Sequence, residues 1–298
     1  MTTTVAAIGL GSMGYGIATS MIKAGMTVFG FDVNQTQIDQ FIAEGGKTGP
    51  AADIGPETSV IVNVVLNAAQ TEATLFGPQG IVPHLKPGSV VIACATVAPE
   101  FAREMATRCA EHEVLYLDAP ISGGSIKAAQ GALTIMASGS PQAFDTAAPV
   151  LDAIAETVFR LSDDPGAGSA MKAVNQLLAG VHIATMAEAM TFGISQGVAP
   201  ETFMKVIPQC AGTSWMLENR GPHIVQGDYA PHSSVNIWPK DLGIVLDIAR
   251  ASGFSAPIAA AALQQFLAAA GSGLGREDDA AVAKVYARNA GLTLPDGD

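Results

Sequence analysis

The first half of the chain alternates short apolar runs with longer segments that carry polar residues at helical spacing. The apolar runs lie at residues 5–8, 26–31, 59–66, 89–93, 114–117, 133–138 and 158–161. Continuous apolar runs of this length are typical of strands buried on both faces of a parallel sheet. The helix-like segments between them lie at residues 36–44, 68–76 and 99–113. This alternation predicts an α/β fold with a doubly wound parallel sheet.

The pattern changes after the turn-forming sequence SDDPG at residues 162–166. Beyond it no segment is convincing as a strand. Helical patterns follow at residues 169–196, 200–208, 240–252, 257–270 and 278–289. We therefore predict an N-terminal α/β domain over residues 1–164 and a helical domain over residues 165–298, and a long helix joins the two.

The composition excludes several classes of function. A net charge of −12 with only 15 Lys and Arg argues against nucleic acid as a partner, because phosphate contacts need a basic face. No uninterrupted run of 18 apolar residues occurs, and the N-terminus lacks a basic segment of the signal-peptide kind. We therefore expect no membrane partner. Cys94, Cys109 and Cys210 are widely spaced, which predicts a reduced cytoplasmic protein without a metal site.

The sequence GLGSMG at residues 9–14 is the first candidate for chemistry, because it follows an apolar run and precedes a helix-compatible segment. Gly9 permits a tight turn, Gly11 lets the backbone approach a pyrophosphate, and Gly14 allows close helix–strand packing. Leu10, Ser12 and Met13 complete this loop. Asp32 follows the next apolar run, 18 residues after Gly14, where a carboxylate accepts hydrogen bonds from a ribose. The motif predicts a Rossmann domain that binds a dinucleotide.

The identity of the dinucleotide follows from the residues around Asp32. A carboxylate there repels a 2′-phosphate, and residues 33–36 (VNQT) supply no Arg to receive one. We therefore predict NAD rather than NADP.

Two further segments carry residues suited to binding a small acid. Ser122, Gly123 and Gly124 end a strand-like run and offer a hydroxyl and N–H groups to a carboxylate, although an ordinary loop has the same composition. Lys172 lies one turn into the long helix, with Asn175 and Gln176 on the same face. Apolar surroundings favour a neutral lysine suited to acid–base work, and the alternative is a lysine whose amine reaches water.

Other polar residues lie at predicted strand ends or helix starts. Thr96, Leu66 and Asn67 follow apolar runs, where they contact a cofactor or serve as turn residues. Lys240 and Asp241 open a helix, where Asp241 suits the helix dipole and Lys240 is a candidate for contact with cofactor or substrate.

Taken together, these segments resemble the β-hydroxyacid dehydrogenase family. The resemblance covers nearly the whole chain and rests on four motifs in order, GLGSMG at 9–14, DAPISGGS at 118–125, KAVNQ at 172–176 and KDL at 240–242. It implies an NAD-binding Rossmann domain over residues 1–164, followed by a helical substrate and oligomerisation domain over residues 165–298 like that of 6-phosphogluconate dehydrogenase. It also implies hydride transfer between NAD and the hydroxyl-bearing carbon of a short hydroxy acid.

The resemblance also implies residue roles. Lys172 becomes the general acid/base, and Ser122, Gly123 and Gly124 hold the substrate carboxylate. The side chains at 175 and 176 orient the substrate, and Lys240 lies near the cofactor, with Asp241 as its partner.

Within the family, residues 174–182 (VNQLLAGVH) and 214–220 (SWMLENR) resemble the L-threonate dehydrogenase branch, which oxidises a C2 hydroxyl to a 2-oxo acid. Gln176 agrees with this branch, whereas many relatives have Asn. Trp238-Pro239 departs from it. The alternatives are a 3-hydroxyisobutyrate dehydrogenase, a tartronate semialdehyde-type reductase, an imine reductase or a non-catalytic NAD-binding protein.

The apolar composition and the small residues of the long helix predict a homodimer or homotetramer. Five small residues there allow close helix packing: Ala173, Ala179, Gly180, Ala184 and Ala187.

Overall fold

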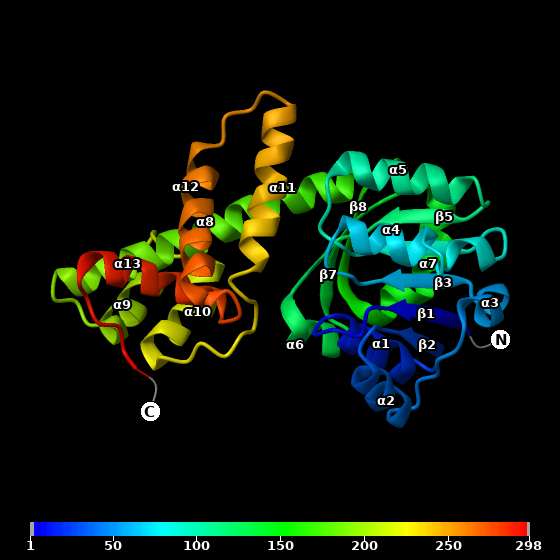
Figure 1. Cartoon of the computed structure of the whole chain (residues 1–298), viewed down its shortest axis with the longest axis horizontal. Coiled ribbons are helices and arrows are strands. Elements are labelled where there is room, and N and C mark those ends of the chain that lie inside the picture. Colours follow the sequence, from blue (N-terminus) through cyan, green and yellow to red (C-terminus); the bar gives the residue numbers. More distant parts are fainter. Residues whose placement is uncertain (1–2, 297–298) are drawn as a thin grey trace. The chain divides into compact units, whose positions relative to one another are not determined.

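The computed structural model describes residues 3–296, and it divides the chain into two compact units (Figure 1). The first unit ends at Lys172 and the second begins at Ala173. The boundary expected after residue 164 precedes helix α8 (Ala167–Ser195), whereas the observed division falls inside that helix. Hydrogen bonds from the first turn of α8 to the sheet, described below, account for this difference.

The first unit contains an eight-stranded sheet in the order β2-β1-β3-β4-β5-β7-β6, with β8 paired to β7. The strands are β1 (Thr4–Ile8), β2 (Thr27–Phe31), β3 (Val60–Asn63), β4 (Val90–Ala93), β5 (Leu115–Asp118), β6 (Ile121–Ser122), β7 (Leu133–Ser138) and β8 (Ala155–Ser162). The ladders from β2 to β5 and from β7 to β8 are parallel, as predicted. β7 runs antiparallel to β5 and to the unpredicted two-residue strand β6.

Helices cover both faces of this sheet (Figure 1). They are α1 (Gly14–Lys23), α2 (Gln35–Ala43), α3 (Ala51–Ile54), α4 (Ala68–Phe76), α5 (Pro99–Ala110), α6 (Gly124–Ala129) and α7 (Pro141–Ile154). Adjacent strand residues point to opposite faces, so Val60 and Val62 join the core under α1 and α7, while Ile61 joins the core under α4 and α5. The doubly wound α/β prediction is therefore confirmed.

The second unit is helical. After α8 it contains α9 (Pro200–Val206), α10 (Trp215–Gln226), α11 (Ile237–Ala251), α12 (Pro257–Ala269), the 3₁₀ helix η5 (Asp279–Val282) and α13 (Ala283–Ala290). Between residues 173 and 296 the structure assigns no strand, in agreement with the sequence pattern. The pattern did not predict α7 or α10, and each contains an internal proline, Pro149 or Pro222, a residue that usually interrupts a helix.

Helix α8 supplies much of the core of the second unit. Ile183, Met186 and Met190 are buried in this core. A Cβ on Gly180 would lie 2.8 Å from the Trp238 ring, so glycine is needed there for α11 to approach α8. Among the described helices, α8 is the one whose length and apolar composition match a membrane span, a property that core helices of soluble proteins share.

A buried ion cluster joins α10, α11 and η5. Arg220 Nε lies 2.6 Å from Asp279 Oδ1, and Asp279 Oδ2 accepts a hydrogen bond of 3.0 Å from Trp238 Nε1. Asp278 Oδ1 lies 2.9 Å from His223 Nδ1. Burial raises the pKa of Asp278, but the hydrogen bonds with His223 and with backbone N–H groups outweigh it and lower that pKa to about 2.

Candidate functional site

The glycine loop has the geometry that its sequence predicts. Gly9 adopts a φ of +90°, and a Cβ there would overlap the carbonyl oxygen of Val64. A Cβ on Gly14 would overlap the carbonyl oxygen of Gly9. In contrast, a Cβ on Gly11 would meet no atom within 4 Å. Gly9 and Gly14 are therefore required by the fold itself, whereas the space beside Gly11 allows a ligand to approach the backbone.

The loop leads directly into α1. Leu10 is buried, Ser12 is exposed, and Met13 is the residue before the helix. The first turn of α1 carries no acidic side chain, and no side chain caps its N-terminus. The N–H groups of this turn and the helix dipole thus suit a phosphate.

Asp32 follows β2 and is hydrogen-bonded to the glycine loop. Its Oδ2 accepts from the backbone N–H of Leu10 at 2.7 Å, and its Oδ1 accepts from that of Asn34 at 2.8 Å. Each carboxylate oxygen retains capacity for another donor, such as a ribose hydroxyl. Val33, the next residue, is fully exposed. The residues present therefore fit a dinucleotide.

Leu66, Asn67 and Thr96 lie after strands of the same sheet. Asn67 caps α4, because its side chain accepts from the backbone N–H of Gln70 at 2.9 Å. Leu66 is exposed and Thr96 is half-buried. The side chain of Asn67 thus serves as a turn residue, which was the alternative expected from the sequence. Contact with a cofactor stays a prediction for all three residues.

The structure brings Lys172 next to the Ser-Gly-Gly loop. Lys172 is 8% exposed, and its Nζ donates a hydrogen bond of 2.8 Å to the carbonyl oxygen of Ile121, the residue before Ser122. Gly123 and Gly124 both have positive φ, +134° and +75°. Successive glycines in such conformations can turn backbone N–H groups towards an anion. The amine of Lys172 is therefore buried beside this loop, whereas the alternative expected from the sequence was a lysine whose amine reaches water.

The remaining polar candidates form a hydrogen-bonded group in the second unit. Asn175 Nδ2 donates to Gln176 Oε1 at 2.9 Å, and Gln176 Nε2 donates to Asp241 Oδ2 at 2.5 Å. Lys240 Nζ pairs with Asp241 Oδ1 at 2.6 Å, the pairing expected from the sequence. Gln176 and Asp241 are buried. The two neighbours therefore fix which end of the Gln176 amide donates and which accepts.

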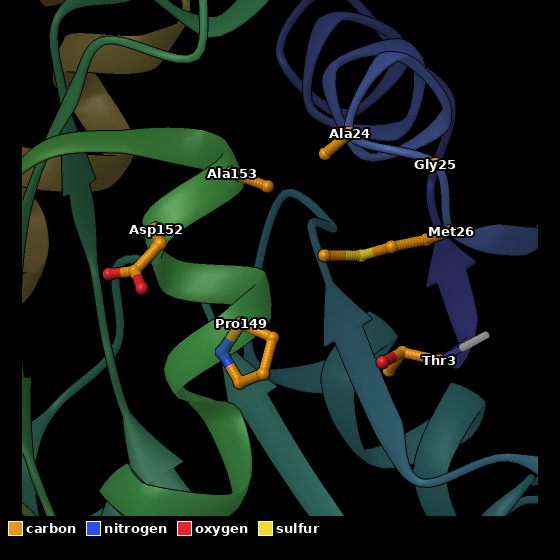
Figure 2. Close-up of a pocket in the computed structure, with 7 residues that line it drawn as sticks. All are labelled: Thr3, Ala24, Gly25, Met26, Pro149, Asp152 and Ala153. Carbon is orange, nitrogen blue, oxygen red and sulfur yellow. The ribbon is translucent and has the colours of Figure 1, made fainter. Parts of the chain in front are cut away.

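A hollow in the first unit does not coincide with these residues. It has a volume of about 410 Å³ and is lined by Thr3, Ala24, Gly25, Met26, Pro149, Asp152 and Ala153 (Figure 2). Thr3 precedes β1 and Met26 precedes β2, so the hollow lies at the amino ends of these strands. Ligands of open α/β sheets bind at the carboxyl ends. The described residues contain no cluster of His, Cys, Asp or Glu suited to a metal ion.

Family profiles match both halves of the chain. Residues 4–162 match the NAD binding domain of 6-phosphogluconate dehydrogenase. Residues 166–286 match the NAD-binding domain of NADP-dependent 3-hydroxyisobutyrate dehydrogenase.

Curated relatives match over nearly the full length. The chain is 48% identical to an L-threonate dehydrogenase of Cupriavidus necator, with 99% of each chain covered. It is 45% identical to an L-threonate dehydrogenase of Escherichia coli, with 98% of this chain and 96% of the relative covered. A crystal structure of a 3-hydroxyisobutyrate dehydrogenase from Salmonella typhimurium is 45% identical, with a TM-score of 0.89 over 95% of this chain and 99% of that one.

With matches over both halves and over the full length, the chain belongs to the β-hydroxyacid dehydrogenase family. It is accordingly an oxidoreductase that acts on a hydroxy acid with a nicotinamide cofactor, as the sequence motifs predicted. An imine reductase from Streptomyces aurantiacus shares the fold at 20% identity.

Proposed function

We propose that the protein oxidises the C2 hydroxyl of L-threonate to the 2-oxo acid with NAD. The observation that carries the proposal is the buried amine of Lys172, held 2.8 Å from the Ile121 carbonyl at the start of the Ser-Gly-Gly loop. This arrangement can hold an acid by its carboxylate while an amine meets the neighbouring hydroxyl. The full-length similarity to L-threonate dehydrogenases supports the choice of acid.

Lys172 is the proposed general base. Its neutral amine takes the proton of the C2 hydroxyl as the C2–O bond becomes a carbonyl, and it returns a proton in the reverse direction. NAD, when bound, would supply the acceptor for the C2 hydrogen, which leaves as hydride with both electrons of the C–H bond. The charges balance, because the substrate loses one proton and one hydride.

Hydrogen bonds hold the substrate in this proposal. Ser122 Oγ and the N–H groups of Gly123 and Gly124 bind the carboxylate, which fixes C2 relative to Lys172. Gln176 lies one turn after Lys172 on α8. Hydrogen bonds with Asn175 and Asp241 orient its amide, which is proposed to form a hydrogen bond with a further hydroxyl of the four-carbon acid. A longer amide than Asn suits a substrate with hydroxyls beyond C2.

NAD is the proposed cofactor. The Asp32 carboxylate and the absence of Arg from residues 33–36 disfavour the 2′-phosphate of NADP. The N–H groups at the start of α1 bind the pyrophosphate. Leu66, Asn67, Thr96 and Lys240 keep their predicted role as further cofactor contacts.

Replacement of Lys172 tests the mechanism. Lys172→Ala should lower kcat by about 10²–10⁴-fold, the usual contribution of a general base, while the Kd for NADH stays within about twofold. Lys205→Ala, at an exposed lysine of α9, is the matched control and should keep full activity. If Lys172→Ala retains wild-type turnover, the proposed role of Lys172 is wrong.

A second candidate substrate is 3-hydroxyisobutyrate. It is favoured by the name of the solved structure at 45% identity. In this acid the hydroxyl lies on C3, so Lys172 would meet a carbon one bond further from the carboxylate. Comparison of kcat/KM for the two acids decides between them.

We also propose a cytoplasmic homodimer or homotetramer. The small residues Ala184 and Ala187 are buried within their own unit, so they do not supply an interface. Met171, Val174 and Leu178 instead line an exposed face of α8, with 44%, 55% and 49% exposure. A monomeric mass in light scattering at all concentrations would contradict this assembly.

A further inference from the structure

Asp118, at the end of β5, is a buried carboxylate that the proposed reaction does not use. It is 1% exposed. Its Oδ2 accepts from the backbone N–H groups of Gly166 and Ser169 at 2.9 and 2.8 Å, and its Oδ1 accepts from Ser169 Oγ at 2.6 Å. Ser138 Oγ donates a weaker bond of 3.3 Å to Oδ2. The carboxyl group therefore has four donors from two segments of the chain, β7 and the start of α8.

These donors lie at the start of α8. The first N–H groups of a helix have no partner within the helix, and a side chain just before the helix usually satisfies them. Here Asp118 does so from a strand 48 residues earlier than Gly166. Ser138, its partner across the β5–β7 ladder, accepts from the N–H of Gly168 at 3.0 Å. Two neighbouring strands thus cap the helix together.

The backbone approaches closely enough to require glycine. A Cβ on Gly168 would overlap the carbonyl oxygen of Met136 and lie 2.5 Å from that of Asp118. Gly166 has a φ of +106° and leaves no room for a Cβ beside the guanidinium of Arg103. The start of α8 is therefore fixed against the sheet by hydrogen bonds and by packing.

The same short segment of chain also holds the amine of Lys172. Ile121, whose carbonyl oxygen accepts from Lys172 Nζ, lies three residues after Asp118. Lys172 lies three residues after Ser169, which is about one helical turn. A closed ring of covalent segments and hydrogen bonds therefore runs through Asp118, Ser169, Lys172 and Ile121. A shift of the helix start relative to Asp118 moves the amine relative to Ile121.

We propose that Asp118 is a positioning residue for Lys172: by capping α8 from β5 it sets the place of the amine beside the Ser-Gly-Gly loop. This inference rests on the proposed role of Lys172 as general base. Displacement of a reacting group by about 1 Å can cost 10²-fold in rate, so precise placement of the helix start has kinetic value.

Asp118 acts in this proposal by accepting hydrogen bonds, so the variants are chosen to remove or to keep its acceptor atoms. Asp118→Ala removes all acceptors. Asp118→Asn keeps the acceptor of the two backbone N–H groups, because its carbonyl oxygen can replace Oδ2, and its amide nitrogen can donate to Ser169 Oγ in place of the bond that Oδ1 accepted. Ser140→Ala is the matched control, since Ser140 caps α7 by accepting from the N–H of Ala143 at 3.2 Å and has no place in the ring.

The experiment measures kcat per NADH-binding site, KM, the Kd for NADH and the melting temperature. Asp118→Ala should lower kcat by about 10–100-fold with the Kd for NADH within about twofold, and Asp118→Asn should restore kcat to within about fivefold of wild type. Ser140→Ala should lower the melting temperature alone. Wild-type kcat in Asp118→Ala, or no rescue by Asp118→Asn, would overturn the inference.

If Asp118→Ala does not fold, Ser169→Ala is measured instead, because it removes only the bond to Oδ1. A fall in kcat of about threefold, absent from Ser140→Ala, supports the inference, and an unchanged kcat overturns it. The Lys172→Ala background separates the two proposals. If Lys172→Ala keeps its turnover, the proposed function fails first. If it is inactive while Asp118→Ala is fully active, only the positioning role fails.

A double-mutant cycle gives a further check through residual turnover. Once Lys172 is absent, Asp118→Ala should cause no additional loss, because the group that it positions is gone. If the two substitutions lower the turnover by factors that multiply in the double variant, Asp118 does not act through Lys172.

Discussion

The buried ion cluster of the second unit predicts a large effect for Arg220→Met. Arg220 is 8% exposed, and its removal leaves the buried carboxylate of Asp279 without its ion-pair partner, while Asp278 keeps only His223. Breaking a buried ion pair by removing one partner typically costs about 3–5 kcal/mol. With an unfolding entropy of about 2.1 cal/mol/K per residue, this cost lowers the melting temperature by about 5–8 °C if all 298 residues unfold together.

Urea unfolding followed by circular dichroism, together with thermal melts, measures the effect. The control is Arg250→Met, because the ion pair of Arg250 with Asp247 is exposed and contributes about 0–1 kcal/mol. Adding Asp279→Asn to Arg220→Met should recover part of the loss, since it removes one uncompensated charge. A change in melting temperature below about 2 °C for Arg220→Met, or an equal change for Arg250→Met, would refute this reasoning.

Three further predictions concern the glycine loop, the polar group of the second unit and acid stability. Gly14→Ala should lower both the melting temperature and NADH affinity, whereas Gly11→Ala should weaken NADH binding alone, as measured by melts and NADH fluorescence; equal melting losses would contradict the packing at Gly14. Asp241→Asn should raise the KM for substrate by about tenfold with little change in kcat, because Gln176 loses its fixed orientation; an unchanged KM would contradict this. Asp278, whose pKa is lowered to about 2, contributes stability above its unfolded pKa of about 3.9 that is lost as the pH falls towards 2; urea midpoints that stay constant from pH 5 to pH 2 would refute it.

The cofactor loop and the alternating sheet could be predicted because their signals are local. Gly9, Gly11, Gly14 and Asp32 lie within 24 residues, and each has one steric or electrostatic task that the sequence spacing reveals. Buried parallel strands are likewise continuous apolar runs, which the sequence shows directly. Except for β6, the strands of the first unit therefore begin and end within a few residues of the predicted apolar runs.

The capping of α8 by Asp118 could not be predicted, because it joins residues about 50 positions apart. The sequence shows Asp118 only as part of a motif, without the partner that explains it. Strand β6 has two residues, too few for any pattern, and α7 and α10 contain prolines that obscure their helical spacing. The position of Lys172 could be predicted, but its hydrogen bond to Ile121 required the fold.

Absorbance of NADH during incubation with L-threonate tests the central claim most directly. The purified protein is given NAD or NADP and, separately, L-threonate, D-threonate, D-erythronate, 3-hydroxyisobutyrate, D-glycerate and L-serine. We expect NADH formation with L-threonate at the highest kcat/KM, with NAD strongly preferred over NADP. A higher kcat/KM for 3-hydroxyisobutyrate, or no turnover of L-threonate by protein that binds NADH, would contradict the proposed function.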